Sequence, residues 1–269
     1  MKKILVLILA VLVASCAYQV RTYDKVVITQ EEPVKIEPPA LELKVGEKLI
    51  YAVDWLGIPS GWITLETVEI TQLDDRPVYH IIARASVNKL MKFLYNMEYT
   101  VHTYIDKEKL RPVKFFKQRK VGNKVVDEEI DFIYEENKVI WKYSSPKNQR
   151  ELSMPKEPQD LLSLLYYFRL KDIEIYKNYF VDVAYGGMIW PADITLEGIK
   201  DIEINNLGHF RTVIVRTVSQ FLANITGSKE IYINFSLDAK RIPLIYRVPS
   251  KVGYFTGILI SYRECKNLN

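Results

Sequence analysis

Histidine and cysteine are the side chains that most often bind transition metals, and the sequence has three histidines and two cysteines. His80, His102 and His209 show neither His-x-His nor His-Glu-x-x-His spacing, so we expect no metal site. His80 and His102 are instead expected to lie on sheet faces. Cys265 lies in a polar tail without a nearby base to form its thiolate, and we expect no catalytic role for it.

Paired carboxylates are the next candidates, because a general acid and a general base are often two such groups. The pairs Asp74-Asp75, Glu128-Glu129 and Glu135-Glu136 lie in predicted turns or at neighbouring strand positions, which point to opposite faces. We interpret them as solvated charge. The sequence also contains no Gly-x-Ser-x-Gly elbow, phosphate-binding glycine loop or dinucleotide fingerprint. It therefore predicts neither an enzyme nor a protein with a cofactor.

Cys16 is the residue with the clearest predicted chemistry. A basic start is followed by an uninterrupted apolar run at 4–13, and Val13-Ala14-Ser15-Cys16 resembles a bacterial lipobox. A charged start, a short apolar stretch and small residues at the cleavage site are the features of a secretory signal peptide. In a lipobox the cysteine becomes a diacylglyceryl thioether. We therefore expect a lipoprotein signal peptide at 1–15 and lipidation of Cys16.

The predicted anchor also indicates a compartment. An apolar run of about ten residues is too short to span a bilayer core of roughly 30 Å, whereas two or more acyl chains hold a protein stably at a membrane. Ala17 follows the cysteine where an aspartate, by resemblance to enterobacterial lipoproteins, favours retention at the inner membrane. We expect a palmitate-bearing lipoprotein whose partner is the membrane, on the periplasmic face of the outer membrane.

The composition of the chain excludes other classes of protein. Thirty-seven Lys and Arg residues against 33 Asp and Glu residues give a formal net charge of +4, too small and too evenly spread for nucleic-acid binding. Two cysteines cannot form a disulfide framework. The 269 residues, of which 48% are hydrophobic, are sufficient for a large domain with a packed core.

Strands are the elements expected to position any binding residues. Apolar residues recur at every second position from Leu41 onward, and turn residues interrupt them about every ten positions. We predict a single antiparallel β domain of about thirteen strands at 41–263, between a lipidated tether at 16–40 and a tail at 264–269. Because a large sheet avoids exposed edges by curling, the fold class is an all-β barrel or half-barrel. The expected strands cover residues 49–55, 63–67, 79–85, 99–105, 112–121, 125–134, 138–143, 180–185, 194–204, 210–218, 230–237, 242–248 and 257–263.

One segment breaks this alternation. Residues 159–169 contain neither glycine nor proline, follow Pro158 and carry apolar side chains on nearly all sides of a helix. A helix that is apolar all round must be buried, so we expect it against the concave face of the sheet. A second apolar segment, 88–95, is predicted to be a short helix or a mobile flap between two strands.

An amphipathic or lipid ligand is predicted in a cavity between the helix and the sheet, because the chain is rich in Trp and Tyr, which combine an apolar body with a polar tip. The expected contacts are Trp55, Trp62, Phe93, Tyr166 and Arg169. Arg169 shares a helical face with Tyr166 and is expected to meet an anionic head group, while the segment 88–95 covers the entrance. The alternative is a filled core in which Arg169 pairs with an acid such as Asp160.

A set of motifs resembles a known family. In chain order they are Gly46-Glu47-Lys48-Leu49-Ile50-Tyr51 leading to Trp55 and Gly61; Asp160-Leu161-Leu162-Ser163-Leu164-Leu165-Tyr166; Arg169; and Asp238-Ala239-Lys240-Arg241-Ile242-Pro243. Together they resemble the exported bacterial family called domain of unknown function 3108, over about residues 41–263. The resemblance implies an architecture rather than a chemistry. More distantly, it is similar to the half-barrels of periplasmic lipoprotein carriers, which is an analogy of fold alone.

Three hypotheses about function stay open. The first is an envelope lipoprotein that binds or presents an amphipathic ligand, and the second is a structural or assembly lipoprotein that docks another envelope protein. The third is an envelope hydrolase that uses carboxylates such as Asp54 or Asp160, although no nucleophile, base and orienting group can be named. An internal cavity, a continuous exposed apolar patch, or convergent polar groups in a cleft would favour them in turn.

Overall fold

The computed structural model describes residues 21–22, 37–40, 42–92, 97–174, 177–250 and 253–264. Cys16, Phe93 and Cys265 lie outside these ranges, as does the predicted signal peptide. Within the described ranges, no helix is long and apolar enough to cross a membrane.

Sixteen strands and three short helices are described. The strands are β1 (Arg21–Thr22), β2 (Lys48–Trp55), β3 (Ile58–Leu73), β4 (Arg76–Val87), β5 (Met97–Asp106), β6 (Pro112–Val121), β7 (Lys124–Ile133), β8 (Lys138–Tyr143), β9 (Ser145–Ser153), β10 (Pro158–Gln159), β11 (Asn178–Tyr185), β12 (Met188–Ile204), β13 (Gly208–Val218), β14 (Glu230–Ser236), β15 (Pro243–Pro249) and β16 (Tyr254–Arg263). The helices are α2 (Lys89–Lys92), α3 (Ser163–Leu170) and α4 (Gln220–Thr226).

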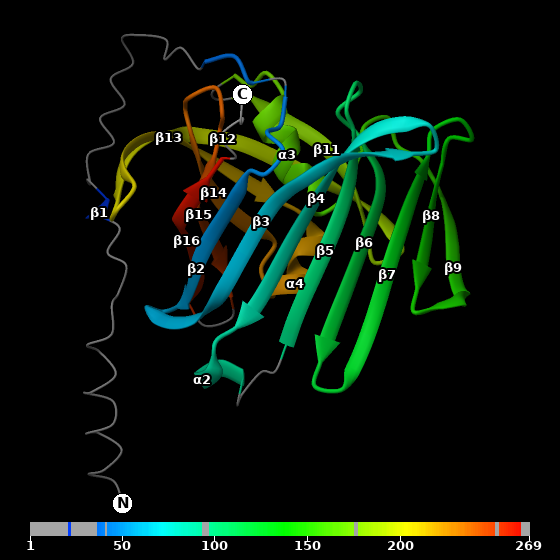
Figure 1. The fold of residues 1–269 in the computed structure, drawn as a ribbon, viewed down its shortest axis with the longest axis horizontal. Helices are drawn as coiled ribbons and strands as arrows, with labels where there is room; N and C mark the ends of the chain where they lie inside the picture. The colour runs from blue at the N-terminus through cyan, green and yellow to red at the C-terminus, as the bar shows by residue number, and fades with distance from the viewer. Residues whose placement is uncertain are drawn as a thin grey trace, which may run out of the picture.

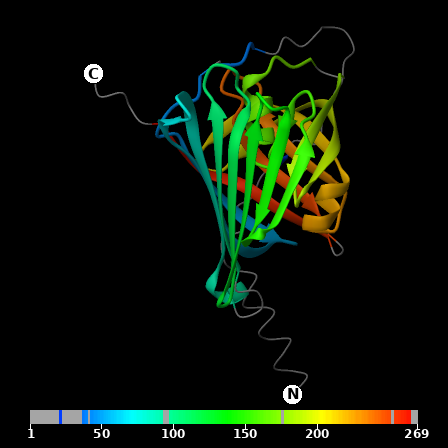
Figure 2. The same ribbon diagram turned by 90° about the vertical axis from the view of Figure 1, so that its right-hand side faces the viewer.

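All of these strands belong to one sheet. Their order is β10-β11-β12-β13-β14-β15-β16-β2-β3-β4-β5-β6-β7-β8-β9, and β1 pairs with β12. The pairing is antiparallel apart from β10 with β11, which is parallel. The sheet curls into a barrel-like shape but is not closed by pairing of its two end strands (Figures 1 and 2). The predicted all-β, mainly antiparallel curled sheet is therefore confirmed.

Three strands are absent from the sequence prediction, namely β1, β9 and β10. The sequence of β9, SPKNQRELS, is polar and does not alternate, because this strand lies at the end of the sheet and pairs only with β8. The strands β1 and β10 have two residues each, too few for any periodicity to be detected.

The inner face of the sheet forms the core. On β4, Tyr79 and Ile81 are buried in it, and His80 between them points to the outer face. Leu162, Tyr166 and Leu170 of the helical segment pack into the same cluster as the inner residues of β2 to β5. A second cluster joins the opposite side of the helix to β11, β12 and β13. The short helix α3 is thus enclosed by the sheet, as its composition predicts.

Helix α3 begins at Ser163 rather than at residue 159, since Pro158 and Gln159 form β10. Asp160 precedes the first turn of the helix. Its side chain accepts a hydrogen bond from a backbone N–H group, and such bonds favour non-helical backbone before a helix begins. Helix α2, at Lys89–Lys92, is the described part of the predicted flap. It connects β4 to β5 at the opposite end of β5 from α3 (Figure 1).

Side chains join two parts of the curled sheet that no strand ladder connects. Glu128 of β7 is 2% exposed, so its interpretation as solvated charge is wrong. It accepts hydrogen bonds from Trp141 Nε1 at 2.9 Å and from the backbone N of Gly186 at 2.8 Å, and it forms an ion pair with Lys117. The next residue, Gly187, has a φ of 73°, and a Cβ there would lie 3.0 Å from the ring of Trp141. The turn between β11 and β12 is therefore held tightly against β7 and β8.

Candidate ligand-binding pocket

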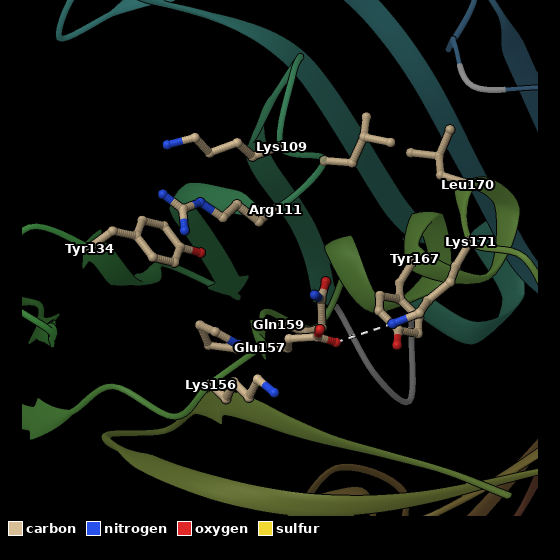
Figure 3. Close-up of a pocket in the computed structure, with 11 residues that line it drawn as sticks. Lys109, Arg111, Tyr134, Lys156, Glu157, Gln159, Tyr167, Leu170 and Lys171 are labelled. Atoms are coloured by element: carbon tan, nitrogen blue, oxygen red, sulfur yellow. Dashed lines mark hydrogen bonds and ion pairs between the residues drawn. The ribbon is translucent and has the colours of Figure 1, made fainter.

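A pocket of about 550 Å³ lies between α3 and the segments that follow β5, β7 and β9 (Figure 3). A cavity of this size is within the range of small-molecule sites, roughly 300–1,000 Å³. Its apolar and aromatic walls are Leu110, Tyr134, Pro158, Tyr167 and Leu170. The pocket lies at one end of the barrel, between α3 and these connecting segments. The predicted space between the helix and the concave face of the sheet is filled by packed side chains, as in the filled-core alternative.

The polar lining of the pocket is predominantly cationic. Lys109, Arg111, Lys156 and Lys171 contribute four positive charges, against the single carboxylate of Glu157. Lys171 Nζ lies 3.1 Å from Glu157 Oε2, and Figure 3 shows this pair across the pocket from Lys109 and Arg111. The other three cations form no ion pair within the part of the chain that the structure describes. Lys109 and Lys156 are exposed to solvent, and Arg111 lies within electrostatic range of Glu135. The lining of the pocket therefore carries a net positive charge.

Arg111 lies over an aromatic ring in the pocket. Its guanidinium carbon lies 3.4 Å from the centroid of the Tyr134 ring, and Tyr134 donates a hydrogen bond to Pro112 O at 2.8 Å. Burial raises the pKa of the Tyr134 hydroxyl, so the ring stays neutral beneath the cation. Among the described residues, the buried Nε of Arg111 has no hydrogen-bond partner. Such an atom is costly unless a ligand or solvent satisfies it.

Lys171 is fixed on the helical side of the pocket. Its Nζ lies 4.6 Å from the centroid of the Tyr167 ring. Burial opposes the charged form of Lys171, but its interactions with Tyr167 and Glu157 outweigh this effect and raise the pKa of the ammonium above its ordinary value. Lys171 is therefore fully charged at neutral pH.

The helix that carries Tyr167 and Leu170 is held at its start by Asp160. The Oδ1 of this buried carboxylate accepts hydrogen bonds from the backbone N–H groups of Leu162 and Ser163, each at 2.7 Å. Its Oδ2 accepts a hydrogen bond of 2.6 Å from Thr103 Oγ1 on β5. Burial raises the pKa of Asp160 to about 6, against an ordinary value of 3.8. Asp160 thus satisfies the free N–H groups of the first turn and ties them to the sheet.

The last turn of the helix is joined by a buried ion pair to Glu47, the residue before β2. Arg169 Nη1 and Nη2 donate to Glu47 Oε1 and Oε2 at 2.6 and 2.8 Å. Glu47 and Arg169 are 3% and 4% exposed, and Arg169 also lies 5.2 Å from the ring centroid of Tyr166. Despite burial, the Glu47 carboxylate raises the pKa of Arg169, so the guanidinium stays charged.

Arg241 holds the C-terminal end of α3. It is 1% exposed, and its Nη1 donates to the carbonyls of Lys171 and Phe168 while its Nη2 donates to Glu37 O at 2.9 Å. A cation is favourable at a helix C-terminus, where carbonyl groups lack intrahelical partners. Glu47, Asp160, Arg169 and Arg241, all from the motifs identified in the sequence, therefore converge on the placement of one helix.

Two of the predicted ligand contacts lie on the wrong face of α3 to line the pocket. Tyr166 is 1% exposed within the core, and Arg169 is paired with Glu47. Arg169 has an acidic partner, as in the filled-core alternative, but that partner is Glu47 rather than Asp160. Tyr167, Leu170 and Lys171 of the same segment face the pocket instead.

The predicted tryptophan contacts lie at the other end of the barrel. Trp55 stacks on Phe255 with ring centroids 6.2 Å apart, and Trp62 lies on the outer face of β3 with 48% of its surface exposed. Helix α2 lies near them, at the far end of β5 from the pocket. The prediction that the segment 88–95 covers the entrance is therefore wrong for its described part. Phe93 lies outside the described residues.

Two histidines meet on the outer face of the sheet. His80 Nε2 lies 2.9 Å from His102 Nδ1, and His80 Nδ1 lies 3.3 Å from Glu69 Oε1. Burial and the neighbouring His80 lower the pKa of His102. No group of three or more His, Cys, Asp or Glu side chains suited to a metal is found within the described ranges. Asp54, one of the two carboxylates considered for hydrolysis, accepts a hydrogen bond from the Gly57 N–H at 2.9 Å.

The cations of the pocket are the residues that sequence reasoning missed. They come from three places in the chain, around residues 110, 156 and 171, and none of these places has a recognisable motif. A signal was present in Lys109-Leu110-Arg111, where charged residues flank an apolar one, and in the charged pair Lys156-Glu157 before Pro158. That pattern is also typical of ordinary surface turns, so it does not identify a site without the fold.

Residues 50–259 match the family described as protein of unknown function DUF3108. The chain belongs to this family. The resemblance inferred from the sequence motifs is thereby confirmed, and the matched segment contains α3 and every residue that lines the pocket. The family assignment brings no established activity with it.

A solved structure supports the architecture independently. The chain is similar to a β-barrel-like protein of the domain of unknown function DUF1849 from Brucella abortus, with a TM-score of 0.51 and 12% sequence identity. The similarity covers 84% of this chain and 100% of the other. At this identity it shows the fold alone. Comparison with curated protein sequences gives no significant match.

Proposed function

We propose that the protein is a cell-envelope lipoprotein that binds an anionic amphipathic ligand in the pocket between α3 and the sheet, and that it acts as a binding protein rather than as an enzyme. The predicted lipidation of Cys16 supports a place at the membrane, and the apolar walls of the pocket support an amphipathic ligand.

The observation that carries this proposal is the net positive lining of the pocket. Lys109, Arg111 and Lys156 line a cavity of about 550 Å³ and form no ion pair among the described residues. Hydrogen bonds between a guanidinium or ammonium and an anionic group are shorter and stronger than neutral ones. An anionic head group would meet the positive charge of the Arg111 guanidinium, while its apolar chain would contact Tyr134, Tyr167 and Leu170.

Binding of a fluorescent fatty-acid probe tests this proposal. The Cys16→Ser chain, purified without its acyl anchor, should bind the probe saturably, and unlabelled fatty acid should displace it. The substitution Arg111→Gln removes one charge-assisted contact, worth about 1.5–3 kcal/mol, and should weaken binding about 10- to 100-fold. Affinity for a fatty alcohol of equal chain length should change little, because the alcohol lacks the anionic group.

Lys177→Gln is the matched control, since this exposed lysine pairs with Glu174 outside the pocket. It should leave the affinity for the probe unchanged. A folded chain that shows no saturable binding would refute the pocket proposal and favour the docking-lipoprotein alternative. Equal effects of Arg111→Gln and Lys177→Gln would show that any binding occurs elsewhere.

A further inference from the structure

The end of the barrel opposite the pocket exposes large apolar side chains at the tips of neighbouring hairpins. Figures 1 and 2 place the β2–β3 turn, α2 and the β6–β7 turn together at this end. The exposed side chains range from 38% to 55% exposure, and we call them the apolar rim: Leu56, Ile58, Val121, Val125, Tyr254 and Phe255.

Contacts within the rim make part of it a single rigid surface. The backbone N of Leu56 donates to Tyr254 O at 3.3 Å, which joins the β2–β3 turn to the start of β16. The Leu56 side chain covers Gly253, where a Cβ would lie only 2.1 Å from Leu56 Cδ2. Trp55 stacks on Phe255 directly behind this contact. The side chains are thus exposed on ordered tips and do not fold back into the core.

The charged groups around the rim are mainly basic. Lys89 and Lys92 of α2 are exposed beside it. Lys120 and Lys124 flank the β6–β7 turn and are likewise exposed. Two nearby carboxylates are already engaged: Asp54 accepts from the Gly57 N–H at 2.9 Å, and Glu98 accepts from Lys92 Nζ at 3.2 Å. The surface therefore combines projecting apolar side chains with positive charge.

We propose that the apolar rim docks on a membrane surface that contains anionic lipids. Exposed aromatic and aliphatic tips beside lysines are suited to the bilayer interface, where rings enter the head-group region and lysines meet anionic lipids. Single side chains that project from several turns fit a deformable lipid surface better than a protein surface of fixed shape. This inference does not depend on the ligand proposed for the pocket.

Ile58 and Ile70 provide a matched pair for the test. Both lie on β3, they are 47% and 43% exposed, and they lie at opposite ends of the barrel. A polarity-sensitive nitrobenzoxadiazole probe is attached to Ile58→Cys or Ile70→Cys in the full chain, with Cys16 and Cys265 replaced by serine. Vesicles of phosphatidylcholine with or without phosphatidylglycerol carry brominated acyl chains that quench the probe.

We expect the fluorescence emission of the probe at position 58 to shift to shorter wavelength and to be strongly quenched, and phosphatidylglycerol should enhance both effects. The emission of the probe at position 70 should be quenched by at most a few per cent. Replacement of Lys120 and Lys124 by glutamate should weaken the response at position 58 by more than about tenfold. Absent quenching at 58, or equal quenching at both positions, would overturn the proposal, as would quenching at 70 alone. A probe response at 58 that needs no lipid and grows with protein concentration would assign the rim to a second copy and also overturn it.

Discussion

Removal of one partner of the Glu47–Arg169 ion pair should destabilise the fold strongly. Both groups are almost fully buried, at 3% and 4% exposure, and two hydrogen bonds of 2.6 and 2.8 Å join them. Arg169→Met leaves the Glu47 carboxylate buried without its counter-ion, a change that costs about 3–5 kcal/mol. Total stabilities of domains are about 5–15 kcal/mol, so the loss is a large fraction of what holds the fold.

Urea unfolding followed by circular dichroism measures this loss. With a dependence on urea of about 2–3 kcal/mol per M, the midpoint should fall by about 1–2 M for Arg169→Met and similarly for Glu47→Met. The double variant Glu47→Met/Arg169→Met should recover most of the loss, because two apolar side chains of similar length replace two buried charges without leaving one unpaired.

The exposed pair Glu174–Lys177 is the control for this cycle, with side chains 72% and 52% exposed. Its single and double alanine variants should unfold at the wild-type midpoint within error, because solvent screens such pairs. The reasoning is refuted if Arg169→Met unfolds like wild type, or if the double variant loses as much stability as the sum of the two single variants.

Three further substitutions have defined outcomes. Burial raises the pKa of Asp160 to about 6 in the folded state, against 3.8 ordinarily, so this group should lower stability by about 2 kcal/mol as the pH rises from 4 to 6. Asp160→Asn should remove that decline in urea midpoints. Leu164→Asp should cost several kcal/mol in urea unfolding, whereas Leu164→Met should be mild, because Leu164 is buried against β11 to β13. Cys16→Ser should move the protein from the membrane to the soluble fraction without unfolding the β domain, because it removes the acyl anchor.

For each of these three predictions, one experimental result would contradict it. Parallel pH profiles for wild type and Asp160→Asn would show that the carboxyl is not the group that titrates. Equal midpoints for Leu164→Asp and wild type would contradict the burial of this helical face. Failure of the wild-type protein to incorporate labelled palmitate would disprove the predicted lipidation of Cys16.

Local patterns in the sequence determined the class of the fold. Alternation such as Tyr79-His80-Ile81 separates the inner from the outer face because successive strand residues point in opposite directions. The apolar composition of 159–169 required a buried helix, since no exposed face was left for water. Both signals depend only on neighbours in the chain. The motifs likewise identified the family, although not the contacts that their residues make.

The partners of charged residues were decided by the tertiary structure. Arg169 lies 122 positions from Glu47, and only the curl of the sheet brings β2 beside α3. The pocket likewise combines Lys109, Lys156 and Lys171, whose separate segments read as ordinary turns. The curvature of the sheet is the total of small twists and bulges in many strands. The sequence of one strand therefore does not determine which distant turns lie close together. The chain therefore specified what must be buried, and the curl of the sheet decided which charges lie around a cavity.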